Sequence, residues 1–259
     1  MALAPTILLF DSGLGGLTVF REVKTARPDA NFIYVADDAA FPYGNLDEER
    51  LIERVVEVLG RAIAEHSPDL VVVACNTAST LALAELRTRF RVPFVGTVPA
   101  IKPACAQSTT KRVAVLGTQG TVGREYTHAL IREFGAGCDV HLVGSMRLAA
   151  CAEAELAGTP VDDAAIASEI ARCFIEKDGR RTDTVVLACT HYPLLLERFQ
   201  ANARWPVTWL DPAPAIARRV ADLMRARPNG GQPESPHMQF TSGRTPSTKL
   251  AAALARYGF

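Results

Sequence analysis

The chain has 259 residues, which at roughly 150 residues per domain corresponds to between one and two domains. Its 28 basic and 28 acidic side chains give a net charge of zero, which argues against nucleic acid as its main partner. Hydrophobic residues make up 48% and charged residues 22%, which is typical of a globular protein and excludes a disordered one. Apolar runs such as Leu70 to Cys75 are far shorter than the about 20 residues that a membrane span needs.

The N-terminal sequence and the cysteines bear on the compartment. The first residues, MALAPTILLF, place no basic residue before the apolar run and so lack a secretory layout. Six cysteines are too few for a disulfide scaffold in a chain of this length. We therefore expect a cytoplasmic protein whose cysteines are free thiols, metal ligands or catalytic groups.

Short apolar runs alternate with segments of helical periodicity along the chain. Runs rich in Val, Ile, Leu and Phe predict buried strands at Thr6–Phe10, Asn31–Ala36, Leu70–Ala74, Pro93–Thr97, Arg112–Gly117, Val140–Gly144, Thr184–Ala188 and Val207–Leu210. In Asp47–His66, apolar residues recur at the spacing of an amphipathic helix. The Pro- and Gly-rich stretch Arg227–His237 predicts an exposed loop, and Thr248–Tyr257 a last helix. Continuous apolarity favours parallel sheets covered on both faces, which is an α/β architecture.

A weak internal repeat indicates two related halves. Val71–Thr77 reads VVVACNT and Val185–His191 reads VVLACTH, at an offset of 114 residues, although two ordinary strand–helix junctions can match by chance. We expect two pseudo-symmetric parallel-sheet α/β domains, one formed by residues 1–97 plus 208–259 and the other by 98–207, with the active site in the cleft between them. This division assumes that the late strand at 207–210 returns to the first domain.

Cys75 and Cys189 end the two copies of the repeated strand. In open α/β sheets, ligands bind beyond the carboxyl ends of the strands, where the N-terminus of the next helix stabilises a thiolate. Most cysteines are simply small buried hydrophobic residues. Four others in this chain fit that description: Cys105, Cys138, Cys151 and Cys173. Cys75 and Cys189 are candidate catalytic thiols because both occupy the position where a ligand is expected.

The loop Asp11–Gly16, with the sequence DSGLGG, follows the first strand. Its three glycines let backbone N–H groups approach a small anion such as a carboxylate, which leaves Asp11 free for an ammonium or a thiol. The loop lacks the Gly-Lys-Ser/Thr of a phosphate-binding loop and the last glycine of the dinucleotide fingerprint, so we expect no nucleotide. A plain tight turn between strand and helix is the alternative.

Further polar residues follow other strands. Tyr43, in a Pro-Tyr-Gly stretch, is a candidate either to hydrogen-bond a ligand or to cover the core. Thr118 and Thr121 are either carboxylate ligands at a helix start or plain helix caps. His191, two residues after the second thiol, is placed to orient or deprotonate that thiol or to donate to a carboxylate. The chain has no Cys-x-x-Cys pair and no ligand spacing among its other histidines, so we expect no metal.

Five segments match the pattern of one known family. They are FDSGLGGLTVF at 10–20, the Asp-x-Ala-x-x-Pro-Tyr-Gly loop at 37–44, ACNTAST at 74–80, LGTQGTV at 116–122 and ACTHYPLL at 188–195. Together they resemble the glutamate racemases of the aspartate/glutamate racemase superfamily, and an FTSG segment at 240–243 also fits. The match runs in order from Ile7 to about Val220.

The resemblance implies a cofactor-independent enzyme that interconverts L- and D-glutamate and supplies D-glutamate for peptidoglycan synthesis. It assigns Cys75 to D-glutamate and Cys189 to L-glutamate. Asp11 would assist Cys75, and His191 would assist Cys189. It also implies residues that hold the two carboxylates and the ammonium of the substrate: Asp11, Ser12, Tyr43, Gly44, Asn76, Thr77, Thr118, Thr121, Thr190 and His191. The stretch Arg147–Gly158 departs from the family pattern, so whether Glu153 or Glu155 reaches the site stays open.

The chemistry of racemisation agrees with this interpretation. A proton leaves one face of the α-carbon and arrives at the other, which suits two fixed thiols from two related domains. Pyridoxal phosphate would need a Schiff-base lysine, and none of the five lysines falls in these motifs.

Three other interpretations compete with this one. They are a superfamily racemase acting on aspartate or a hydantoin, a one-cysteine decarboxylase or isomerase, which the second thiol disfavours, and a non-catalytic amino-acid sensor or protein-binding module. We expect glutamate as the small-molecule partner and no cofactor, and we consider a homodimer.

Overall fold

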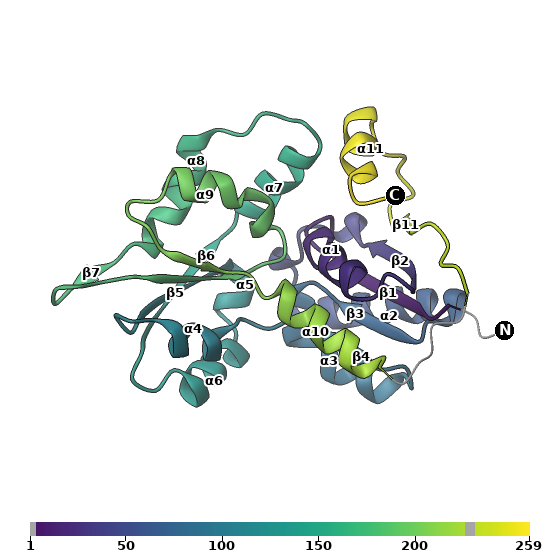
Figure 1. Cartoon of the computed structure of the whole chain (residues 1–259), viewed down its shortest axis with the longest axis horizontal. Coiled ribbons are helices and arrows are strands. Elements are labelled where there is room, and N and C mark those ends of the chain that lie inside the picture. The colour runs from purple at the N-terminus through teal and green to yellow at the C-terminus, as the bar shows by residue number, and fades with distance from the viewer. Residues whose placement is uncertain (1–3, 226–230) are drawn as a thin grey trace.

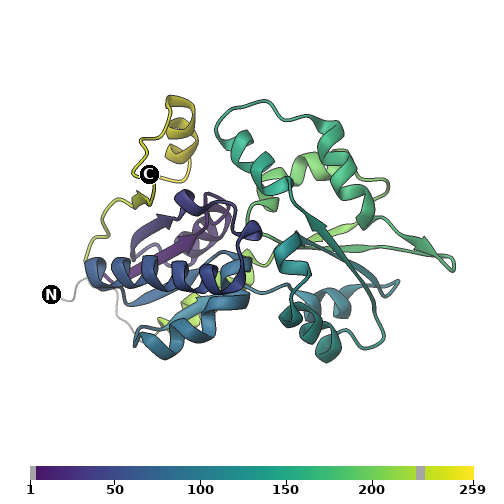
Figure 2. The same cartoon turned by 180° about the vertical axis from the view of Figure 1, so that it is seen from behind.

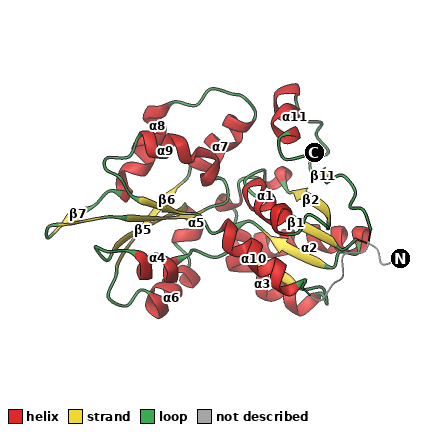
Figure 3. Ribbon diagram, in the orientation of Figure 1, coloured by secondary structure: helices red, strands yellow, loops and turns green. Residues whose placement is uncertain are grey.

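The computed structural model describes residues 4–225 and 231–259, and most of them belong to two parallel sheets flanked by helices (Figure 1). Figure 3 shows that the strands of each sheet lie between layers of helices, which confirms the expected α/β architecture. Of the predicted loop at 227–237, residues 227–230 lie outside the described residues, and 231–236 form no helix or strand. No helix within the described ranges is long and apolar enough to span a bilayer.

The first sheet has five parallel strands in the order β11-β2-β1-β3-β4. These strands are β1 (Thr6–Asp11), β2 (Asn31–Ala36), β3 (Leu70–Val73), β4 (Phe94–Gly96) and β11 (His237–Phe240). One face of the sheet is covered by α1 (Leu17–Ala26), α10 (Ala213–Leu223) and α11 (Thr248–Ala255). The other is covered by α2 (Glu48–His66) and α3 (Asn76–Arg89), and the long α2 crosses that face in the view from behind (Figure 2).

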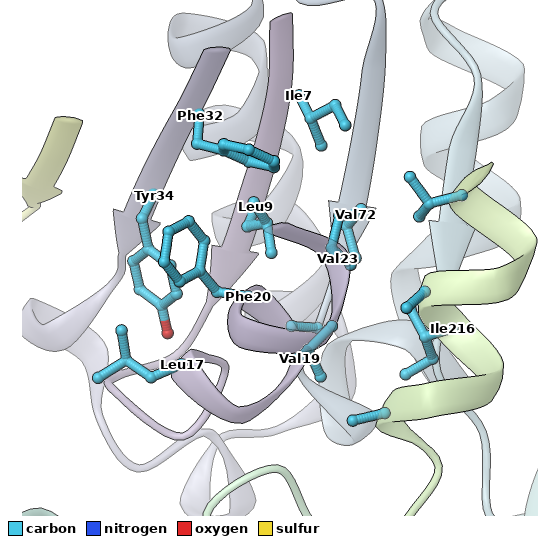
Figure 4. Packing of buried hydrophobic residues seen from close by; sticks show 14 of the residues in the cluster. Ile7, Leu9, Leu17, Val19, Phe20, Val23, Phe32, Tyr34, Val72 and Ile216 are labelled. Atoms are coloured by element: carbon cyan, nitrogen blue, oxygen red, sulfur yellow. The ribbon is translucent and has the colours of Figure 1, made fainter. Parts of the chain in front are cut away.

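Aromatic packing fixes α1 on the first sheet (Figure 4). Phe20 of α1 meets Phe32 edge-on at 5.4 Å between ring centroids and Tyr34 at 6.4 Å. All three side chains are almost fully buried, and each contributes roughly 1.5–3 kcal/mol by leaving water. The loop between β1 and α1 is therefore held at the carboxyl end of the central strand.

The second sheet has four parallel strands in the order β10-β9-β5-β6. They are β5 (Arg112–Thr118), β6 (Asp139–Ser145), β9 (Thr184–Ala188) and β10 (Thr208–Leu210). One face is covered by α7 (Leu148–Leu156), α8 (Asp163–Ile170) and α9 (Leu196–Ala201), and the other by α4 (Ile101–Gln107) and α6 (Glu125–Phe134). The strands β7 (Glu176–Lys177) and β8 (Arg180–Arg181) form a small hairpin.

The two sheets repeat one strand order. The order β2-β1-β3-β4 of the first sheet corresponds to β6-β5-β9-β10 of the second, so each strand of the second sheet has a counterpart in the first. The strands β3 and β9 are the two copies of the internal repeat. The two halves are therefore pseudo-symmetric, as the repeat predicts.

The late strand is placed differently from the prediction. We expected residues 207–210 to return to the first domain, but β10 pairs with β9 in the second sheet, with Trp209 opposite Val185. The repeat explains this position, because β10 begins 114 residues after β4 and takes the place of β4 in the second half. The chain returns one element later, where α10 packs against α1. The remaining boundaries of the two proposed domains stay a prediction.

Candidate active site

Cys75 and Cys189 occupy equivalent positions in the two halves. Cys75 follows β3 and is the N-cap residue of α3, whereas Cys189 follows β9 and precedes a short 3-10 helix at Tyr192–Leu195. The two thiols are almost fully buried, with 5% and 6% of their surface exposed. Both line one cavity between the two halves of the chain. The other four thiols do not line it.

Residues from both halves form the walls of this cavity. Besides the two thiols they are Ser12, Phe41, Pro42, Tyr43, Gly44, Asn76, Thr77, Thr118, Ala149, Thr190 and His191. The structure thus brings together most of the residues that the sequence singled out, while Asp11 and Thr121 do not line the cavity but hydrogen-bond to Thr190 and Thr77, which do. The cavity volume of about 20 Å³ is close to the space that one water molecule needs, so a larger ligand requires the walls to move apart.

The surroundings of Cys75 favour the neutral thiol. Its Sγ lies 3.6 Å from Ser12 Oγ. Burial and the negative charge of Asp11 raise the pKa of Cys75 to about 12, although the backbone N–H of Ala78 and the Ser12 hydroxyl oppose this shift. A positive charge brought into the cavity would stabilise the thiolate of Cys75.

Cys189 has a histidine as its neighbour. Its Sγ lies 3.8 Å from Nδ1 of His191, and Nε2 of His191 lies 2.9 Å from Oε1 of Glu153. Burial alone would lower the pKa of His191, but the hydrogen bonds to Cys189 and Glu153 raise that pKa well above its ordinary value. A protonated imidazole at this position places a positive charge beside the sulfur of Cys189.

Glu153, and not Glu155, reaches the site. Besides His191, Oε1 of Glu153 accepts a 2.5 Å hydrogen bond from the backbone N–H of Leu14. Burial raises the pKa of Glu153, but the contacts with His191 outweigh it and hold the pKa below its ordinary value. Glu155 instead pairs with Arg198 at 2.8 Å on the outside of α7.

Helical spacing alone does not separate these two acidic residues. Ala149 and Ala152 of α7 face the core of the second half. Glu153 lies four positions after Ala149, but Glu155 lies three positions after Ala152, and both spacings bring residues together on one helix face, so only the contact with His191 identifies Glu153.

The glycine-rich loop at 11–16 binds the protein's own carboxylates. Oδ2 of Asp11, which is fully buried, accepts hydrogen bonds from the backbone N–H groups of Gly13 and Gly16 at 3.3 and 3.0 Å. Oδ1 of Asp11 accepts one from the Thr190 hydroxyl at 3.3 Å. Burial raises the pKa of Asp11, and the charge of His191 opposes that shift. The expectation that these N–H groups receive an external anion is therefore wrong for the two amides that Asp11 occupies.

One glycine of this loop is required by close approach. A Cβ at Gly15 would lie 2.4 Å from Nδ1 and 2.6 Å from the backbone nitrogen of His191. Such contacts do not occur in folded proteins, so a side chain at position 15 would displace the histidine beside the second thiol. The glycine thus lets the loop of the first half pack directly on the site of the second.

Three threonines join the two halves beside the cavity. The Thr77 hydroxyl, from α3, lies 3.2 Å from that of Thr118 and 3.1 Å from that of Thr121. The Thr118 hydroxyl also caps α5 (Gln119–Val122) by accepting a hydrogen bond from the Thr121 N–H at 3.1 Å. Thr118 is therefore a helix cap that also lines the cavity, and its role as a carboxylate ligand stays a prediction.

Asn76 and Tyr43 present contrasting polar groups. Neither the oxygen nor the nitrogen of the buried Asn76 amide has a hydrogen-bond partner among the described residues, and the residue is only 2% exposed. A buried polar group normally has a partner, so this amide points to a polar ligand. The Tyr43 hydroxyl, in contrast, donates to Oδ2 of Asp37 at 2.5 Å and is not available for a ligand. The described part of the chain contains no group of three or more residues that could hold a metal ion.

The fold and the site together define a class of protein: two related α/β halves, each of which contributes a thiol to a shared cavity. Comparisons with known proteins agree. A family model described as Asp/Glu/Hydantoin racemase matches residues 18–220. The glutamate racemase of Brucella canis is 52% identical over 254 residues, which cover 97% of this chain and 92% of the relative.

Solved structures give the same result. The structure of Escherichia coli glutamate racemase in complex with L-glutamate and the activator UDP-MurNAc-Ala has a TM-score of 0.90 and 40% identity, and the match covers 98% of this chain and 96% of that one. For glutamate racemase from Thermus thermophilus in complex with β-chloro-D-alanine, the TM-score is 0.76 and the identity 28%, covering 97% and 93%. The chain belongs to the aspartate/glutamate/hydantoin racemase family and is an enzyme of the racemase class.

Proposed function

We propose that this enzyme interconverts L- and D-glutamate without a cofactor, by moving a proton between the two faces of the α-carbon through Cys75 and Cys189. The observation that carries the proposal is that these two buried thiols, one from each half, line a single cavity. The similar solved and curated proteins are named glutamate racemases, which supports glutamate as the substrate.

The cavity walls suit an amino acid with two carboxylates. The hydroxyls of Ser12, Thr77, Thr118 and Thr190 and the unpaired amide of Asn76 line it. These groups donate hydrogen bonds to carboxylates and leave the ammonium of the substrate near the negative charge of Asp11. Binding of a substrate in this way would satisfy the Asn76 amide.

The proposed reaction conserves charge over one turnover. From L-glutamate, the Cys189 thiolate takes the α-proton, and the electrons of the C–H bond move into the adjacent carboxylate. The Cys75 thiol then gives its proton to the opposite face of the α-carbon. The enzyme ends with Cys75 as thiolate and Cys189 as thiol, which is the starting state for the reverse reaction.

The electrostatics fit these roles. The imidazolium of His191, backed by Glu153, stabilises the thiolate of Cys189. The raised pKa of Cys75 keeps it a proton donor until the ammonium of a bound substrate offsets the charge of Asp11. General acid and base groups each contribute roughly 10²–10⁴-fold to the rate of such reactions.

The cellular role is a further part of the proposal. D-Glutamate for peptidoglycan is the product that the resemblance to glutamate racemases implies. Free thiols at all six cysteines fit a reducing compartment, so we propose the cytoplasm. A homodimer stays a prediction, which light scattering on the purified protein would test.

The direct test is incubation of the purified protein with each enantiomer of glutamate and of aspartate, followed by circular dichroism. We expect both glutamate enantiomers to converge on the racemic mixture with no added cofactor and with a chelator present. Faster racemisation of aspartate, or loss of activity on dialysis against the chelator, would overturn the proposal.

A further inference from the structure

A fully buried carboxylate lies behind the cavity wall, and the reaction does not use it. Asp37, just after β2, accepts four hydrogen bonds. They come from the Tyr43 hydroxyl at 2.5 Å, from Nε and Nη2 of Arg54 at 2.9 and 2.5 Å, and from the Thr241 hydroxyl at 2.6 Å. An isolated buried carboxylate would be costly, but four donor groups from three side chains, two of them on the guanidinium of Arg54, compensate for the loss of water.

The donors come from three separate parts of the chain. Arg54 lies on α2, Tyr43 lies in the short 3-10 helix Tyr43–Asn45, and Thr241 follows the edge strand β11. Thr241 is 204 positions from Asp37 in the sequence. Asp37 therefore joins the end of the chain to the segment that follows β2.

That segment forms one side of the cavity. Residues 41–44 all line it, and the ring of Phe41 lies 5.4 Å from the ring of His191. A Cβ at Gly44 would lie 3.4 Å from Cβ of Thr118 in the other half. We call residues 38–44 the wall segment. Its position sets the shape of the cavity on the side of both His191 and the threonines.

A second carboxylate holds the same segment to the end of the chain. Asp38 accepts hydrogen bonds from the backbone N–H of Ser242 at 3.0 Å and from the Ser242 hydroxyl at 2.6 Å. It also forms an ion pair with Arg244 at 2.9 Å. The FTSG motif at 240–243, which has no place in the reaction itself, thus supplies donors to two neighbouring acids at the base of the wall segment.

We propose that Asp37 is a positioning residue for the racemase reaction: together with Thr241 it anchors the wall segment to the first half through the Tyr43 hydroxyl, so that this wall keeps its shape when the two halves move apart to admit the substrate. The proposal rests on the proposed function. Asp37 does not touch the cavity, and it acts only through Tyr43. The hydroxyl of Tyr43 bonds to Asp37, and Tyr43 is also one of the residues that line the cavity.

The kinetic consequence follows from the population of the anchored state. When an anchor is lost, the wall segment occupies other positions for part of the time, and only the anchored fraction binds substrate. The apparent affinity falls by that fraction, whereas the bound complex reacts as before. KM should therefore rise, and kcat should change little.

Three conservative substitutions test this role of the anchor. Thr241→Val and Tyr43→Phe each remove one donor to Asp37, and Thr241→Ser keeps the donor. We expect KM for glutamate to rise about fivefold or more in Thr241→Val and Tyr43→Phe, with kcat within about twofold of the wild type, and Thr241→Ser to restore the wild-type KM. The matched control is Thr25→Val, because the Thr25 hydroxyl donates to Arg21 O at 2.9 Å on the exposed side of α1, away from the cavity.

A second readout needs no substrate. Release of the wall segment should expose Cys75, so alkylation of Cys75 by iodoacetamide, followed by mass spectrometry, should be faster in Thr241→Val and Tyr43→Phe than in the wild type or Thr25→Val. If the wild type does not racemise glutamate, the proposed function is refuted, but the alkylation rates still test whether the anchor holds the wall segment. Folded variants with wild-type KM and wild-type alkylation, and only a lower Tm, would show that the anchor is structural and overturn the inference.

Discussion

Replacing Glu153 with glutamine tests the negative charge that lies behind His191. The substitution keeps the shape of the side chain and removes the charge that bonds to His191 Nε2 at 2.9 Å. A hydrogen bond to a charged group contributes about 1.5–3 kcal/mol, and each 1.36 kcal/mol corresponds to a tenfold change in rate. We therefore expect kcat/KM to fall by about 10- to 150-fold. The fall must be equal for both enantiomers, because they have the same free energy in solution.

The pH profile separates this effect from simple damage to the fold. Glu153 contributes to the raised pKa of His191, so its loss should lower that pKa. If the imidazolium is needed, the decline of kcat/KM at high pH should begin at a lower pH in Glu153→Gln than in the wild type. Racemisation is followed by circular dichroism from each enantiomer between pH 6 and about pH 10.

The same helix supplies the control. Glu155→Gln removes a charge two residues away that pairs with Arg198 on the surface, at 2.8 Å. Exposed ion pairs contribute little, so kcat/KM should stay within about twofold of the wild type. Equal losses in Glu153→Gln and Glu155→Gln, or an unshifted pH profile in Glu153→Gln, would refute the reasoning about His191.

Three further results follow from the structure. The first concerns Asp183. Burial raises the pKa of Asp183, but the hydrogen bonds from the Ser108 hydroxyl at 2.6 Å and from nearby donors outweigh burial and hold that pKa well below its ordinary 3.8. Its stabilising effect is thus present above that value and lost as the pH falls through the folded pKa. Asp183→Asn should lower the unfolding free energy at pH 7 in urea titrations, and the difference from wild type should narrow below about pH 4. Because burial and Asp11 raise the pKa of Cys75 to about 12, its alkylation by iodoacetamide should still accelerate above pH 10, and a plateau near pH 8 would contradict this. Cys173→Ala should keep wild-type turnover at a stability cost of about 1 kcal/mol, measured by thermal unfolding, because this buried thiol lies outside the cavity.

The strands and the positions of the two thiols can be predicted from local sequence. Continuous apolar runs define buried parallel strands, and a cysteine that directly follows such a strand lies at the carboxyl edge of the sheet wherever the strand sits. The repeat also predicts the shared cavity, because equivalent strand ends in pseudo-symmetric halves face one another. The repeat also accounts for β10, whose sheet we predicted wrongly. Its offset of 114 residues from β4 indicates the equivalent position in the second sheet.

Contacts between distant segments are not visible in local patterns. Nothing near Tyr43 in the sequence indicates that its hydroxyl bonds to Asp37 while Thr241 bonds to the same carboxylate from the end of the chain. The N–H group of Leu14 looked free because the acid that accepts its hydrogen bond, Glu153, lies 139 residues away. The bond between Glu153 and Leu14 depends on how the two halves dock, and the bond between Thr241 and Asp37 depends on where β11 joins the first sheet, which no window of sequence contains.

The central claim, that each thiol serves one face of the α-carbon, is tested most directly by α-deuterium incorporation in D₂O. NMR follows each glutamate enantiomer with Cys75→Ala and with Cys189→Ala. We predict that neither variant racemises, that Cys75→Ala exchanges the α-proton of L-glutamate only, and that Cys189→Ala exchanges that of D-glutamate only, each without inversion. Racemisation by Cys189→Ala at the wild-type rate would contradict the two-thiol mechanism and leave Cys75 as a single base.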